Sequence, residues 1–91
     1  MVAVVSHDAG GAEILSSYVR QHRADAVFVL DGPARAIFAR KLGALRHVAL
    51  DAAVAQCEQV ICGTSWRSDL EIDAIRAAKS LGKPSVAFLD H

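Results

Sequence analysis

Short apolar runs alternate with helical patterns along the whole chain. Residues 2–5 are continuously apolar, which is typical of a parallel strand covered on both faces. The apolar runs predict strands over residues 2–5, 26–30, 46–50, 59–62 and 85–89. Apolar residues at helical spacing predict helices over residues 11–22, 33–42, 52–57 and 68–82 between them.

Residues with known positional preferences support several helix boundaries. Pro33 suits a first helical position, Asp51 could cap the short helix that follows it, and Ser68 with Glu71 forms a capping box. In the first helix, helical spacing predicts a buried stripe made of Ile14, Leu15, Tyr18 and Val19.

This alternation of strands and helices is the βαβ pattern of a parallel sheet. Right-handed crossovers then favour a Rossmann-like α/β three-layer sandwich with five parallel strands in the order 3-2-1-4-5. We expect one domain over residues 1–91, the amino-terminal half of a longer two-domain protein. No helix follows residues 85–89, so another domain or a second subunit is expected to cover that strand.

Composition narrows the range of functions. Apolar residues make up 53% of the 91-residue chain and the net charge is zero. The chain lacks the basic stretch of a nucleic-acid binder, an apolar run of about 18 residues that could span a membrane, and a signal peptide. We therefore expect a cytoplasmic protein that does not bind nucleic acid, with Cys57 and Cys62 as buried, reduced thiols.

The strongest candidate for a site is residues 7–11, His-Asp-Ala-Gly-Gly, directly after the first strand. Ligands of open α/β sheets bind beyond the carboxyl ends of the strands. Gly10 and Gly11 would allow a ligand to approach the backbone closely, and His7 could act as an acid or a base. The alternative is structural: Asp8 caps the helix and the glycines only form a tight turn.

Two other strand ends carry polar residues. Thr64 and Ser65 could bind a sugar or a phosphate, or form an ordinary turn; Trp66 could stack on a ligand or cover the sheet. Asp90 and His91 would face the same crevice. The spacing of the glycines matches neither a dinucleotide fingerprint nor a P-loop, and the histidines lack the spacing of metal ligands, so we predict neither a metal nor a cofactor.

Four segments resemble the amino-terminal half of a group of bacterial polysaccharide-biosynthesis proteins, which are similar to GT-B-fold glycosyltransferases and to UDP-N-acetylglucosamine 2-epimerase. The segments are residues 7–11, 31–34, 63–66 and 86–91. The epimerase elements Gly-Asp-Thr and His-Val-Glu-Ala-Gly are replaced here by residues 63–65 and 89–91. The resemblance therefore points to the location of the site more than to epimerisation itself.

The resemblance implies a nucleotide-sugar enzyme with a cleft between two Rossmann-like halves. This chain would supply the side of the cleft that binds the sugar or the acceptor, and would be inactive alone. It implies His7 and Asp90 as acid and base, with Gly10 and Gly11 packed against the sugar or the diphosphate. The other candidate ligand-binding residues, expected from their position at the strand ends, are Asp8, Thr64, Ser65 and His91. The alternative from another class is a non-catalytic α/β binding or regulatory module that forms a homodimer through its last strand.

Overall fold

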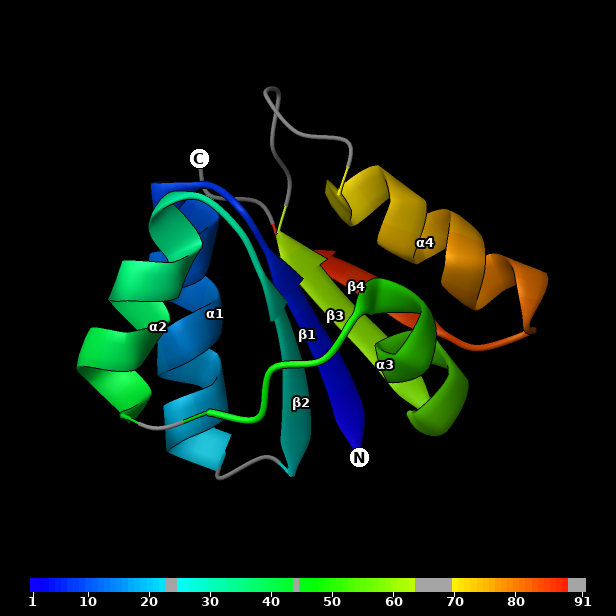
Figure 1. Ribbon diagram of the computed structural model, residues 1–91, viewed down its shortest axis with the longest axis horizontal. Coiled ribbons are helices and arrows are strands. Elements are labelled where there is room, and N and C mark those ends of the chain that lie inside the picture. Colours follow the sequence, from blue (N-terminus) through cyan, green and yellow to red (C-terminus); the bar gives the residue numbers. More distant parts are fainter. Residues whose placement is uncertain (23–24, 44, 64–69, 89–91) are drawn as a thin grey trace.

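The computed structural model describes residues 1–22, 25–43, 45–63 and 70–88, and these form a sheet between two layers of helices (Figure 1). Helices α1 and α2 cover one face of the sheet, and α3 and α4 cover the other. The elements are β1 (Val2–Ser6), α1 (Ala9–His22), β2 (Ala26–Leu30), α2 (Pro33–Leu42), α3 (Leu50–Gln56), β3 (Gln59–Gly63), α4 (Leu70–Ser80) and β4 (Ser85–Phe88).

The sheet is parallel, with the strands in the order β2-β1-β3-β4. The predicted α/β class with a parallel sheet is confirmed. The prediction of five strands in the order 3-2-1-4-5 is wrong, because residues 46–50 do not form a strand. The other four predicted strands are present and occupy the predicted relative positions.

Residues 46–48 do lie beside the outer edge of β2, but they pair with it at one bridge only, between His47 and Phe28. The Phe28 N–H donates to the Arg46 carbonyl at 2.8 Å, and the Val48 N–H donates to the Phe28 carbonyl at 3.1 Å. The chain then enters α3 at Leu50. Ala53 and Val54 of α3 are buried in the same core as Ala3 and Val5, so the chain turns away from β2 into this helix after a single bridge.

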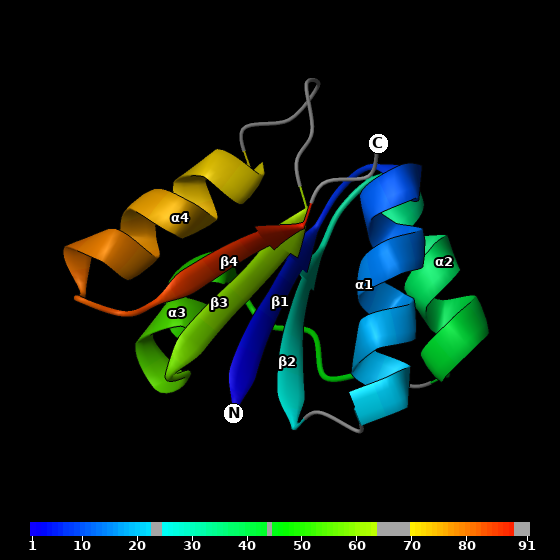
Figure 2. The same ribbon diagram turned by 180° about the vertical axis from the view of Figure 1, so that it is seen from behind.

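Both faces of β1 are buried, and alternate residues belong to different cores. Ala3 and Val5 face a cluster with α3 and α4, whereas Val4 faces a cluster with α1 and α2. In the second cluster the Phe28 and Phe38 rings meet edge to face, with their centroids 5.7 Å apart. The view from behind shows the same order of layers (Figure 2). The continuous apolar run of β1 follows from this double cover.

Some helical positions differ from the predictions. Ile14 is 37% exposed, although Leu15 and Val19 are buried as predicted. Helix α1 begins at Ala9, so it includes both glycines of residues 7–11. Asp51 does not cap α3, whose N-cap is Ala49 with no side-chain hydrogen bond. Among the described residues, no helix is both long and apolar enough to cross a bilayer.

The Phe38 side chain is fully buried, so its truncation should leave a cavity in the α1–α2 core. We expect Phe38→Ala to lower the free energy of unfolding by about 3–5 kcal/mol, measured by urea denaturation. The exposed Lys79→Ala on α4 is the control, with an expected change within about 0.5 kcal/mol. Equal small effects of both substitutions would contradict this packing.

Candidate functional site

The turn between β1 and α1 is fixed by Asp8, which caps the helix. Its Oδ2 accepts a hydrogen bond from the Gly11 N–H at 3.2 Å, and its carbonyl accepts one from the Ala12 N–H at 3.0 Å. A side chain that satisfies an otherwise unpaired N–H of the first turn stabilises a helix by about 1 kcal/mol. The structural role considered for Asp8 is therefore present, and it holds the other oxygen, Oδ1, at the edge of the sheet.

Gly11 allows α1 to approach the end of β3. A Cβ atom on Gly11 would lie 3.1 Å from Asp8 Oδ1 and 3.5 Å from the Cα of Gly63. A Cβ atom on Gly63 would likewise lie 3.4 Å from the Cα of Gly11. The absence of a side chain at Gly11 therefore allows α1 to pack closely against the end of β3. Gly10 lies beside it in the first turn of α1 and is half-buried.

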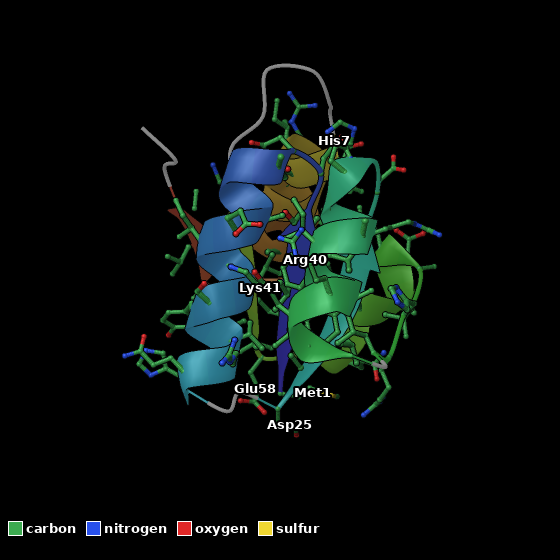
Figure 3. The ribbon with its side chains drawn as sticks, turned by 90° about the vertical axis from the view of Figure 1, so that its left-hand side faces the viewer. Met1, His7, Asp25, Arg40, Lys41 and Glu58 are labelled. Atoms are coloured by element: carbon green, nitrogen blue, oxygen red, sulfur yellow. The ribbon has the colours of Figure 1, made fainter. Side chains whose placement is uncertain are left out.

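The backbone of His7 is held from two sides. Its N–H donates to Glu71 Oε1 on α4 at 2.9 Å, and its carbonyl accepts from the Ala34 N–H on α2 at 3.1 Å. The imidazole packs against Gly32, where a Cβ atom would lie 2.8 Å from His7 Nε2. Figure 3 shows His7 at the end of the molecule where α2 begins. His7 therefore connects β1 with helices on both faces of the sheet.

Glu71 is a buried acid that the sequence analysis did not include in the site. Only 2% of its surface is exposed, although it lies in the first turn of α4. The sequence predicted that Glu71 forms a capping box with Ser68, which lies outside the described residues. The sequence signal that could have placed Glu71 at the site was its position in the first turn of the helix after β3, near the edge where the strands end. Its carboxylate brings α4 to the β1–α1 turn.

Three consecutive residues each place a polar side-chain atom in the interior at this edge. Ser6 Oγ, His7 Nδ1 and Asp8 Oδ1 are buried and have no hydrogen-bond partner among the described residues. Ser6 itself is 0% exposed. A buried polar atom without a partner typically costs about 1–3 kcal/mol. A bound molecule that formed hydrogen bonds with these atoms would offset this cost, so the cluster is a candidate binding site. We call these three residues, with Glu71, the rim cluster.

The surroundings of the rim cluster also affect the nearby thiol. Burial, and to a smaller extent the negative charge of Glu71, together raise the pKa of Cys62 on β3 to about 11. The pKa of Cys57 is also raised, again mainly by burial. Both cysteines are free and buried, as predicted. At neutral pH neither thiol is an activated nucleophile.

Asp31 begins one of the segments that carry the resemblance, residues 31–34, and it lies next to the rim cluster: its N–H donates to the Ser6 carbonyl at 3.1 Å, and its Oδ1 accepts from the Gly32 N–H at 2.8 Å. The remaining candidates lie outside the described residues, and they are Thr64, Ser65, Trp66, Asp90 and His91. Within the described ranges, no group of three or more potential metal ligands gathers.

A separate hollow of about 460 Å³ lies along α1, between Glu13 and Gln21, and reaches Lys41 on α2. Lys41 Nζ lies 2.9 Å from Glu13 Oε2, and an Arg40 nitrogen lies 2.7 Å from Glu13 Oε1. The hydrogen bond from Lys41 is the main cause of a lowered Glu13 pKa. Figure 3 shows Arg40 and Lys41 between the two helices, away from His7. Because these charges pair with one another, the hollow is a weaker candidate for a site than the rim cluster.

Comparison with known proteins identifies no relative. No family model matches the chain, and the searches of curated proteins and of solved structures returned no match. The chemistry of the site therefore depends on the residues described above.

Gly32 and Gly43 form a natural pair of test positions, because both have a positive φ, at 54° and 79°, with similar ψ. Nothing lies within 4 Å of a Cβ atom placed on Gly43. Gly43→Ala should therefore cost about 1–3 kcal/mol from backbone strain alone. Gly32→Ala should cost more, since His7 must also move.

The free energy of unfolding and the NMR signals of the His7 ring measure the two effects. We expect the His7 signals to shift in Gly32→Ala and to stay in place in Gly43→Ala. Equal losses of stability, with unchanged His7 signals in both variants, would show that Gly32 does not position His7.

Proposed function

We propose that this chain is the amino-terminal domain of a nucleotide-sugar enzyme, glycosyltransferase-like or epimerase-like, that acts in polysaccharide biosynthesis. It contributes the side of an interdomain cleft that binds the sugar or the acceptor. The observation that carries the proposal is the rim cluster: Ser6 Oγ, His7 Nδ1 and Asp8 Oδ1, buried without partners among the described residues. The cluster lies at the carboxyl end of the central strand, where parallel α/β sheets bind ligands.

In this proposal His7 is the group that exchanges a proton with the ligand. Its ring lies at the end of β1, and Glu71 and Ala34 hold its backbone through hydrogen bonds of 2.9 and 3.1 Å. An imidazole can act as a general acid or base, and the Nδ1 atom of His7 has no hydrogen-bond partner among the described residues. Asp90 is proposed as the second acid–base group on the resemblance alone. Both roles need a sugar bound over the rim cluster.

The second candidate function is a non-catalytic binding module that forms a dimer through β4. The observation that favours it is the exposure of β4, which pairs with β3 on one side only among the described strands. Val86 is 41% exposed and is in register with the buried Ile61, which belongs to the core beneath α1 and α2. An apolar residue on an edge strand is a typical site of association between sheets.

Titration calorimetry with UDP-N-acetylglucosamine tests the proposed function. We expect binding with a Kd on the order of 1 mM and, in His7→Ala, an affinity about tenfold lower, equivalent to about 1.4 kcal/mol. His47→Ala is the matched control, because His47 is exposed and pairs with the middle of β2; its affinity should be unchanged.

The same samples distinguish the two candidates. Absence of binding, together with a stable dimer in sedimentation experiments that Val86→Lys dissociates, would favour the binding module. Binding that His7→Ala leaves unchanged would remove His7 from the proposed mechanism.

A further inference from the structure

The rim cluster carries hydrogen-bonding groups of a particular kind. An ionised Asp8 only accepts hydrogen bonds, the Ser6 hydroxyl both donates and accepts, and a neutral His7 donates from one ring nitrogen and accepts at the other. The atoms that lack partners among the described residues are Asp8 Oδ1, Ser6 Oγ and His7 Nδ1. Groups that donate and accept at once, as alcohol hydroxyls do, complement this set best.

The charges at the rim cluster disfavour an anion there. Helix N-termini commonly bind phosphate, but the first turn of α1 already holds a carboxylate, since Asp8 Oδ2 accepts from the Gly11 N–H. Glu71 adds a second carboxylate, 2% exposed, whose Oε1 lies 2.9 Å from the His7 nitrogen. A phosphate placed over these residues would meet like charges in a region with little water to screen them.

A positive charge is present at the same end of the sheet, but on the other side of β1. Arg35, in the first turn of α2, donates through Nε to the Leu30 carbonyl at the end of β2, at 3.1 Å. The carboxylates of Asp8 and Glu71 lie toward β3 instead: a Cβ atom placed on Gly63 at the end of β3 would lie 3.9 Å from Asp8 Oδ1, and Glu71 belongs to α4, which follows β3. With the strand order β2-β1-β3, the edge carries one guanidinium and one carboxylate toward β2, those of Arg35 and Asp31, and two carboxylates toward β3, those of Asp8 and Glu71.

We infer that the rim cluster binds the neutral sugar ring of the ligand through its hydroxyl groups, and that the phosphates lie toward Arg35, away from Asp8. The inference rests on the proposed function, and it specifies that the sugar ring of a nucleotide sugar, and not its phosphates, contacts the rim cluster. Asp8 Oδ1 accepts from one hydroxyl, and Ser6 Oγ and His7 Nδ1 pair with neighbouring hydroxyls. Asp8 is therefore a binding residue as well as the cap of α1.

Asp8→Asn tests this inference, because asparagine caps a helix about as well as aspartate while removing the charge. Affinities are measured by NMR titration for three probes: methyl N-acetyl-β-D-glucosaminide, UDP and UDP-N-acetylglucosamine. We expect Asp8→Asn to weaken binding of the methyl glycoside about tenfold and to leave UDP binding unchanged. Asp25→Asn, which removes an exposed carboxylate at the opposite end of the sheet, should change neither affinity, and an unchanged melting temperature confirms that Asp8→Asn is folded.

Two outcomes overturn the inference and leave the proposed function standing. One is tighter binding of UDP in Asp8→Asn, which would place the phosphates at Asp8. The other is binding of the methyl glycoside that Asp8→Asn does not change. If none of the three probes binds the unaltered chain, both the inference and the proposed function fail.

Discussion

The double burial of β1 is the constraint on which the rest of the structure depends. This strand pairs with β2 on one edge and with β3 on the other, and its alternate side chains enter separate cores on the two faces of the sheet. A backbone paired on both edges and covered on both faces has no freedom to shift register, because a shift by one residue would exchange the side chains of the two cores. The place where β1 ends is therefore fixed.

This fixed strand end explains why polar groups are buried together there. Ser6 is the last residue of β1 and still lies in the interior. The two residues after it are held by α1, α2 and α4: Asp8 by its bond to Gly11, and His7 by its bonds to Ala34 and Glu71. The apolar cores thus supply the rigidity, and the candidate site consists of polar residues at the end of the rigid strand.

Most of the sheet and part of the site could be predicted from the sequence. The apolar run of β1 and the helical spacing after it indicated a parallel sheet, and residues 7–11 were the strongest candidate for a site; His7 and Asp8 of this segment belong to the rim cluster. Residues 46–50 have the composition of a strand, but the burial of α3 decided their structure, and tertiary packing of this kind leaves no local signal. Tertiary packing also explains the exposure of Ile14, because the predicted apolar face of the first helix is wider than the surface that α1 buries against the sheet.

Glu71 shows the limit of local motifs most clearly. Ser68 and Glu71 match a capping box, and a capping box is complete within one helical turn, so this motif by itself did not indicate a bond between Glu71 and His7. Its bond to the His7 N–H spans 64 positions along the chain and exists only because α4 packs on the same face as Ala3 and Val5. Contacts of this range depend on the assembled fold.

The central claim is that ligand binds at the rim cluster and not in the hollow along α1. The direct measurement is a map of backbone amide chemical shifts during titration with UDP-N-acetylglucosamine. The account predicts the largest shifts at His7, Asp8, Gly11 and Glu71, with Ile14, Tyr18 and Lys41 unchanged. Shifts confined to Ile14, Tyr18 and Lys41 would contradict it.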